Sequence, residues 1–85
     1  RQHAPSHSTL IYGAGGGGKL VLRELSQNRQ LHLDPVGFLD DDFGKQRLRV
    51  DGIPVLGSSD DLETVAAKMR IAELIINRNL LKTAA

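Results

Sequence analysis

The sequence predicts an α/β fold in which helices cover both faces of a mostly parallel sheet. A short apolar run over residues 9–12 leads into a glycine-rich turn and then into a helical pattern. A second apolar run over residues 35–39 leads into three consecutive acids. Apolar runs of this kind that alternate with amphipathic helices are typical of parallel strands buried on both faces.

The other elements follow from local patterns. A first helix is expected over about residues 16–28, where small and apolar residues recur at intervals of three and four. A third strand is expected over residues 53–56, at the edge of the sheet because it contains Pro54. The polar segment 43–51 is expected to be a loop with a brief extended piece. Ser58 as N-cap places Asp61 in a capping box before a second helix, and residues 71–76 form the last predicted strand.

The predicted order is therefore β-α-β-β-α-β. Because crossovers between parallel strands are right-handed, we expect a four-stranded parallel sheet in the order 3-2-1-4. This is a Rossmann-like, three-layer α/β/α arrangement and corresponds to half of a dinucleotide-binding fold. Residues 9–85 would form the nucleotide-binding domain and residues 1–8 a flexible tail or linker. Since the chain begins with Arg1, we expect it to be a fragment of a larger protein.

Composition excludes several classes of function. The chain of 85 residues has no cysteine, so it has neither a disulfide nor a thiolate metal site. Its net charge of +1, with both signs interspersed, gives no electrostatic footprint for nucleic acid. No apolar run reaches the length of a membrane span. A cytoplasmic location, or one on the cytoplasmic side of a membrane protein, is expected.

The glycine-rich turn is the main candidate site. Gly13, Gly15 and Gly18 have the G-x-G-x-x-G spacing, and Gly16 and Gly17 complete the run. In a strand–turn–helix unit the first glycine permits the tight turn, the second lets the backbone approach a pyrophosphate, and the third allows close helix–strand packing. The N–H groups at the helix start then face the phosphates.

The second candidate is the acid that ends the second strand. Asp40 follows Gly18 by 22 positions, and an acid about 20 residues beyond the glycines binds a ribose 2′-hydroxyl in dinucleotide sites. A carboxylate repels a 2′-phosphate, so Asp40 favours NAD over NADP. Asp41 joins the candidate cofactor site, although capping of the loop is the simpler role for Asp41 and Asp42. No metal site is expected, because consecutive residues of an extended chain point in different directions.

Two other interpretations of the glycines are open. Gly13, Gly18 and Lys19 match the start of the triphosphate-binding loop, but Leu20 replaces the serine or threonine that would hold magnesium. Alternatively, the run is a flexible loop that binds no ligand, within a regulatory or assembly module. No catalytic set is visible, since Tyr12 has no lysine four residues further on. Catalytic residues are therefore expected to be absent.

Four sequence blocks resemble a known family: IYGAG at residues 11–15, LREL at 22–25, PVGFLDDD at 35–42 and GIPVLG at 52–57. The chain resembles the nucleotide-binding domain of CapD-like bacterial polysaccharide-biosynthesis proteins, which are nucleoside-diphosphate-sugar epimerases and dehydratases. A similar domain is fused to some polyprenyl-phosphate sugar-1-phosphate transferases. The resemblance implies binding of NAD(H) or a nucleotide sugar in surface-polysaccharide assembly.

The glycine motif also resembles the N-terminal domain of sugar acetyltransferases of the PglD/NeuD kind. That resemblance implies a UDP-sugar as the ligand in place of NAD. In either case we expect a binding domain that is not catalytic alone. A half-fold also leaves an open sheet edge, so self-association through the last strand is expected.

Overall fold

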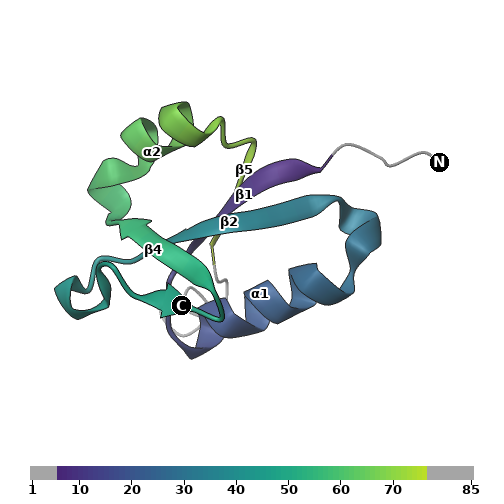
Figure 1. Cartoon of the computed structure of the whole chain (residues 1–85), viewed down its shortest axis with the longest axis horizontal. Coiled ribbons are helices and arrows are strands. Elements are labelled where there is room, and N and C mark those ends of the chain that lie inside the picture. The colour runs from purple at the N-terminus through teal and green to yellow at the C-terminus, as the bar shows by residue number, and fades with distance from the viewer. Residues whose placement is uncertain (1–5, 77–85) are drawn as a thin grey trace, which may run out of the picture.

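The computed structural model describes residues 6–76 (Figure 1). Its strands and helices follow in the order β1 (His7–Tyr12), α1 (Gly16–Gln27), β2 (Leu33–Leu39), β3 (Arg49–Val50), β4 (Ile53–Gly57), α2 (Leu62–Met69) and β5 (Glu73–Ile76). Three one-turn 3-10 helices lie between them, η1 (Arg29–Leu31), η2 (Phe43–Lys45) and η3 (Ser59–Asp61). Residues 1–5 of the expected tail (residues 1–8) and the chain beyond residue 76 lie outside the described part.

The Rossmann-like fold is confirmed. The sheet has the order β3-β4-β2-β1-β5, and β1, β2, β4 and β5 are parallel in the predicted arrangement. The prediction of four strands was wrong by one. Asp51 and Gly52 both have positive φ, at 52° and 87°, and form a two-residue hairpin that pairs Arg49 with Pro54. Strand β4, expected at the edge, therefore lies second in the sheet.

Several strand bounds differ from the predicted ones for local reasons. Strand β2 begins at Leu33, so Pro35 lies inside it, where the register with β1 shifts. An irregularity suits a residue that has no N–H to donate. Strand β1 begins at His7 and so includes two residues expected in the tail. Strand β5 begins late because the Ile71 N–H closes the end of α2 through a 2.9 Å bond to the carbonyl of Ala66.

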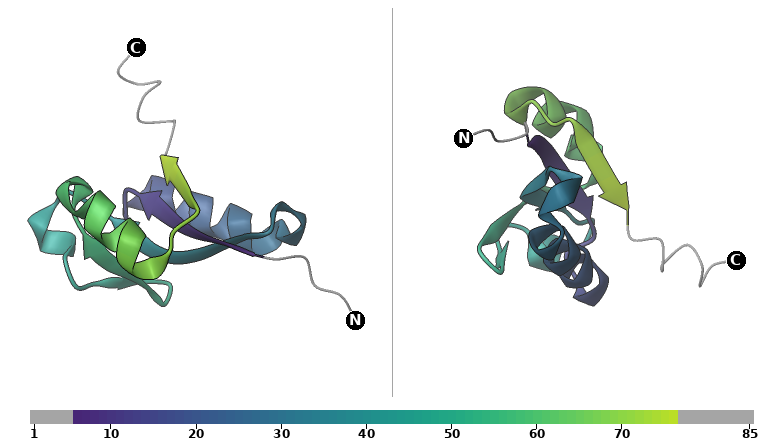
Figure 2. Two further views of the ribbon diagram at one scale, coloured as in Figure 1. Left: turned by 90° about the horizontal axis from the view of Figure 1, so that it is seen from above. Right: turned by 90° about the vertical axis from the view of Figure 1, so that its right-hand side faces the viewer.

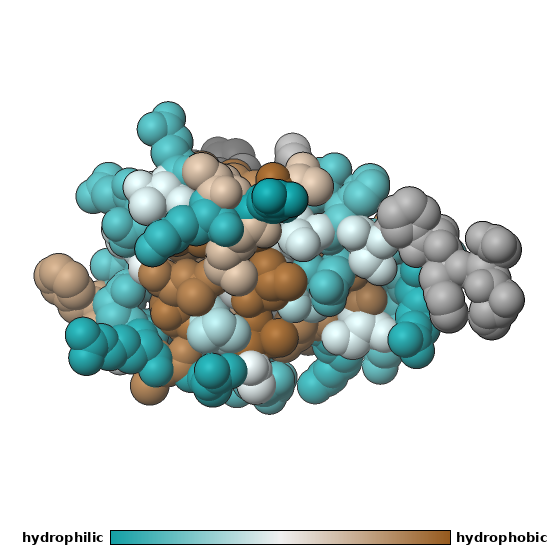
Figure 3. All heavy atoms as spheres, turned by 45° about the horizontal axis from the view of Figure 1, so that its top comes forward, coloured by the Kyte–Doolittle hydropathy of each residue, from teal (hydrophilic) through white to brown (hydrophobic). Residues whose placement is uncertain are grey.

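The two α-helices lie on opposite faces of the sheet (Figure 2). Helix α1 buries the predicted stripe, and its Leu22 and Leu25 pack with Ile11 and Phe38 in the core. Helix α2 has no buried residue, and apolar atoms remain visible in the view that brings its side of the molecule forward (Figure 3). Within residues 6–76, no helix is long and apolar enough to cross a membrane.

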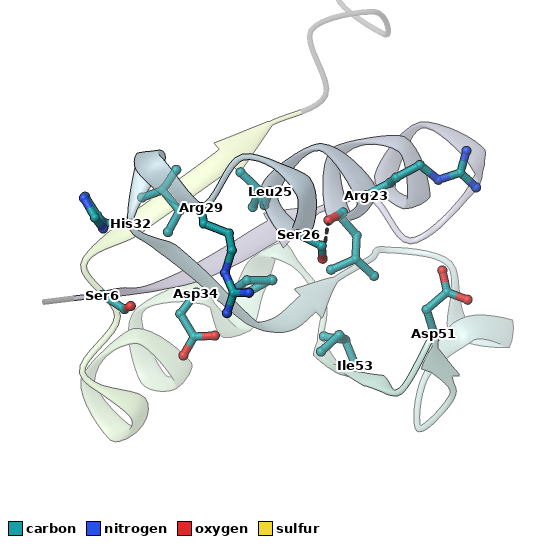
Figure 4. A pocket seen from close by; sticks show the side chains of 12 residues that line it. Ser6, Arg23, Leu25, Ser26, Arg29, His32, Asp34, Asp51 and Ile53 are labelled. Carbon is teal, nitrogen blue, oxygen red and sulfur yellow. Dashed lines mark hydrogen bonds between the residues drawn. The ribbon is translucent and has the colours of Figure 1, made fainter. Parts of the chain in front are cut away.

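The connection from β2 to β4 has no α-helix, only η2 and β3. A crossover between parallel strands usually contains one, and its absence leaves a hollow of about 610 Å³ beside α1 (Figure 4). Apolar and charged groups line it together. Arg29 extends from η1, just after α1, toward Asp34 of β2, while Arg23 points away. The hollow lies at the end of the sheet where β2 begins.

Candidate functional site

The glycine turn is built at the opposite end, where β1 and β2 finish. Gly13 has a φ of 101° and donates a 2.7 Å hydrogen bond to the carbonyl of Leu39. A Cβ on Gly18 would overlap the carbonyl oxygen of Gly13 and lie 3.1 Å from the ring of Phe38. Helix α1 therefore approaches β1 and β2 as closely as a glycine allows, and its first turn is fixed on the end of the sheet.

The first turn of α1 presents backbone donors. Its first intrahelical bond runs from Lys19 N–H to the carbonyl of Gly15 at 3.0 Å, so the preceding N–H groups have no acceptor along the helix. Those groups belong to Gly16, Gly17 and Gly18, and no side chain caps them. Together with the helix dipole, such donors favour an anion.

Asp40 lies directly beside this turn. Its Oδ2 accepts a 2.7 Å bond from Ala14 N–H, and its Oδ1 accepts a 2.8 Å bond from Asp42 N–H. Its own N–H donates to the carbonyl of Gly57 at 2.9 Å. The carboxylate is thus oriented by two backbone donors and is half-buried. A carboxylate has about four acceptor positions, so each oxygen of Asp40 can accept a further bond.

Asp41 has a different role from Asp40 and from the loop cap that we expected. It accepts bonds from the Tyr12 hydroxyl at 2.6 Å, from Ser59 N–H at 2.7 Å and from the Ser59 hydroxyl at 3.1 Å. These donors, Ser59 first, hold the pKa of Asp41 below its usual range. The hydrogen bond between the Tyr12 hydroxyl and Asp41 also raises the pKa of Tyr12. Asp42 is the residue that caps the loop, since its side chain accepts from Gly44 N–H.

Lys45 is a residue of the site that the sequence analysis missed. It ends η2, and a Cβ placed on Gly15 would lie 3.6 Å from its Nζ atom. The amine therefore lies next to the second glycine of the motif. No periodicity marks the segment 43–51, and the only signal was a lysine shortly after the acid that ends β2.

A second hollow, of about 340 Å³, lies between the loops that follow β2 and β4. Its lining includes Asp41, Phe43, Gln46 and Ser59. Phe43 is 92% exposed, which is unusual for an aromatic side chain. Ser58 acts as the expected N-cap, and its capping box with Asp61 begins η3, which leads into α2. The glycine turn, Asp40 and this hollow all lie at the carboxyl ends of the parallel strands, where doubly wound folds bind ligands.

No group of three or more histidine, aspartate or glutamate side chains is placed to hold a metal ion in residues 6–76. Although consecutive, the acids of the PVGFLDDD block diverge. The side chain of Asp40 accepts a hydrogen bond from the glycine turn, that of Asp41 from Ser59 and that of Asp42 from Gly44.

A family model described as a CoA-binding domain matches residues 1–83. The chain belongs to the CoA-binding domain family. It is 35% identical over 83 residues to the probable polysaccharide biosynthesis protein EpsC of Bacillus subtilis. It is 34% identical over 70 residues to the capsular polysaccharide biosynthesis protein CapD of Staphylococcus aureus. These relatives confirm the resemblance to CapD-like proteins.

The chain spans only part of the length of its curated relatives. The matches cover 98% and 81% of the chain but 14% of EpsC and 12% of CapD. Among solved structures, the UDP-D-quinovosamine 4-dehydrogenase of Vibrio fischeri is 30% identical with a TM-score of 0.73, over 84% of this chain and 56% of that one. The Rex-family repressor RSP in complex with β-NADH is 21% identical, with a TM-score of 0.70, over 85% of this chain and 34% of that one. At that identity the likeness is one of fold.

Proposed function

We propose that this domain binds a nucleotide whose diphosphate lies over the first turn of α1 and whose ribose contacts Asp40. NAD(H) is the leading ligand. The observation that carries the proposal is the placement of Asp40, whose carboxylate is held beside the glycine turn by the N–H groups of Ala14 and Asp42. Both oxygens retain acceptor capacity for ribose hydroxyls. The free N–H groups of α1 are adjacent and suit a diphosphate.

We assign the nucleotide base to the hollow between the loops after β2 and β4. It borders Asp41, the neighbour of the proposed ribose ligand. The exposed ring of Phe43 offers a flat apolar surface there. An aromatic ring can stack on any nucleotide base. The proposal thus accounts for an exposed aromatic side chain that the fold itself does not need.

Asp40 also discriminates among nucleotides. NADP has a phosphate on the 2′-oxygen of its ribose and CoA has one on the 3′-oxygen, and both would approach a carboxylate of the same sign. The family description makes CoA a necessary test ligand. We expect Asp40 to favour nucleotides whose ribose hydroxyls are both free.

A nucleotide sugar is the second candidate, and one observation favours it. The solved relative at 30% identity is an enzyme named for a UDP-sugar, and EpsC and CapD are polysaccharide biosynthesis proteins. A UDP-sugar offers the same diphosphate and the same unmodified ribose. The glycine turn and Asp40 would hold it in the same way, so only the base and the second sugar differ.

Calorimetric titration tests the proposal. Wild type, Asp40→Asn and Asp34→Asn are each titrated with NADH, NADPH, CoA and UDP-N-acetylglucosamine. Asp34 is an exposed carboxylate at the opposite end of β2 and is the matched control. Loss of a charged hydrogen bond costs about 1.5–3 kcal/mol, so Asp40→Asn should weaken NADH about tenfold to a hundredfold. The difference in affinity between NADH and either NADPH or CoA should become smaller in this variant.

Each other outcome has a definite meaning. Binding of the UDP-sugar without either dinucleotide establishes the second candidate. Tight binding of CoA that Asp40→Asn leaves unchanged contradicts the ribose role of Asp40. Absence of binding to all four ligands contradicts nucleotide binding by this domain and favours a regulatory or assembly module.

We further propose that the domain performs no chemistry alone and serves a larger surface-polysaccharide biosynthesis protein at the cytoplasmic side of a membrane. That protein would be a nucleotide-sugar epimerase or dehydratase, or a sugar-phosphate transferase fusion. No tyrosine–lysine pair accompanies the glycine turn. Purified domain should therefore show no oxidation, reduction or epimerisation of UDP-sugars in the presence of NAD. Turnover above that of a heat-inactivated sample would contradict this.

A further inference from the structure

We infer that Lys45 is the cationic contact for the diphosphate of the bound nucleotide. The inference rests on the proposed function and names a residue that the glycine motif does not include. It starts from the position of the Lys45 amine, 3.6 Å from where a Cβ of Gly15 would lie. Gly15 is the N-cap of α1, so the amine borders the donors that would meet the phosphates.

The local fold holds Lys45 at this place. Its N–H donates to the carbonyl of Asp42 at 2.9 Å, and the side chain of Asp42 in turn caps η2. The neighbouring Gln46 donates from its side chain to the carbonyl of Asp40 at 2.8 Å. Residues 40–46 are thus folded against the end of β2. Lys45 itself is half-buried, so its stem is partly packed and its amine is directed to the turn.

The negative charge at the carboxyl ends of the strands explains why a bound diphosphate needs a cation. Five carboxylates lie in the loops after β2 and β4, namely Asp40, Asp41, Asp42, Asp60 and Asp61. A diphosphate adds about two further negative charges, and a helix N-terminus supplies the equivalent of only about half a positive charge. Without a fixed cation the acids would repel the ligand that Asp40 is placed to bind.

The Lys45 amine is available for this role. The hydrogen bonds formed around the glycine turn and residues 40–46 do not include its Nζ atom. An ammonium group has three donors, and contact with phosphate oxygens would satisfy them. Lys19, in the first turn of α1, is exposed and belongs to the helix surface. Lys45 is therefore the lysine that the fold brings to Gly15 from a different element.

The test compares Lys45→Met with Lys45→Arg and Lys68→Met. Methionine keeps most of the stem volume and removes the charge, arginine keeps the charge, and Lys68 is an exposed lysine in the last turn of α2. Each protein is titrated with NADH, UDP-N-acetylglucosamine and CoA at low and moderate salt. Lys45→Met should weaken binding of each ligand that wild type binds about tenfold or more. The affinity of Lys45→Met should also change less between low and moderate salt than the affinity of wild type does.

Retained affinity in Lys45→Arg and Lys68→Met would complete the expected pattern. Three results would overturn the inference while leaving the proposed function intact. The first is unchanged affinity in Lys45→Met. The second is a loss confined to CoA, which would place Lys45 on the ribose phosphate instead. The third is a lower melting temperature with an unchanged salt dependence of the affinity, which would make Lys45 a residue that stabilises the fold. If wild type binds none of the ligands, both proposals fail.

Discussion

The Oδ2 atom of Asp40 accepts a 2.7 Å hydrogen bond from the backbone N–H of Ala14. This bond joins the end of β2 to the middle of the glycine turn, 26 residues earlier in the chain. The acid and the turn are therefore one structural unit before any ligand arrives. Such preorganisation reduces the ordering cost of binding, because the proposed ribose and phosphate contacts already have a fixed geometry.

Gly18→Ala should destabilise the fold. Its Cβ would overlap a backbone carbonyl of Gly13, which cannot rotate away as a side chain could. We expect a loss of about 1–3 kcal/mol, equivalent to about 4–8 °C in Tm for each kcal/mol in a domain of this size. Gly16→Ala is the matched control, since nothing lies within 4 Å of its Cβ position. An equal loss in both variants would contradict the packing argument.

Gly15→Ala should lower the affinity for nucleotides without lowering the stability of the fold. The only atom near its Cβ position is the Lys45 Nζ, at an ordinary 3.6 Å, and its φ of −89° suits alanine. The melting temperature should stay close to that of wild type. Affinity for any diphosphate nucleotide should fall, because the methyl group occupies the space over the helix start. Calorimetry and thermal denaturation of the same sample measure the two effects, and unchanged affinity would exclude phosphate contact at Gly15.

Tyr12 should ionise at higher pH than an ordinary tyrosine. Its hydroxyl donates to Asp41 at 2.6 Å, and this bond raises the pKa above 10.0. Since the folded-state pKa is the higher one, the bond contributes stability that is full below pH 10.0 and is lost as pH rises through the folded-state pKa. Tyr12 is the only tyrosine, so ultraviolet absorbance follows it directly. Asp41→Asn should bring the pKa toward 10.0, whereas Asp42→Asn should leave it raised.

The domain should self-associate through β5. Among the described residues 6–76, this strand pairs with β1 alone and forms an edge of the sheet, with Leu74 38% and Ile76 45% exposed. Unpaired edges invite pairing with another chain, and a charge on the edge discourages it. Leu74→Lys should shift sedimentation toward the monomer, whereas Leu20→Lys, on the exposed surface of α1, should not. A wild-type protein that is monomeric at high concentration would contradict this prediction.

The predictable parts of the molecule are those that depend on local pattern. The spacing of Gly13 and Gly18 predicted a tight turn and a close helix, and the apolar runs predicted the order of the four parallel strands. The role of Asp41 depended on contacts between distant elements. Asp41 finds its partners in Tyr12 and Ser59, which are 29 and 18 residues away.

The segment after β2 could be predicted only in part, for a related reason. The expected brief extended piece was found as β3. The polar residues of the segment have neither a helical nor a strand period, so nothing in the sequence marked the one-turn helix η2. The position of Lys45 depends on that one-turn helix and therefore could not be seen either. Pro54 misled the prediction because the hairpin at Asp51 and Gly52 adds a strand outside β4.

The pairing of β1 with β5 has a consequence for synthesis on the ribosome. Residues 9–12 gain their second neighbour only from residues 73–76, at the far end of the described chain. A nascent chain that has emerged through β4 still exposes one side of β1, and synthesis proceeds at about 5–20 residues per second. Strand β1 must therefore wait several seconds for its last partner, and it is open to chaperones during that interval.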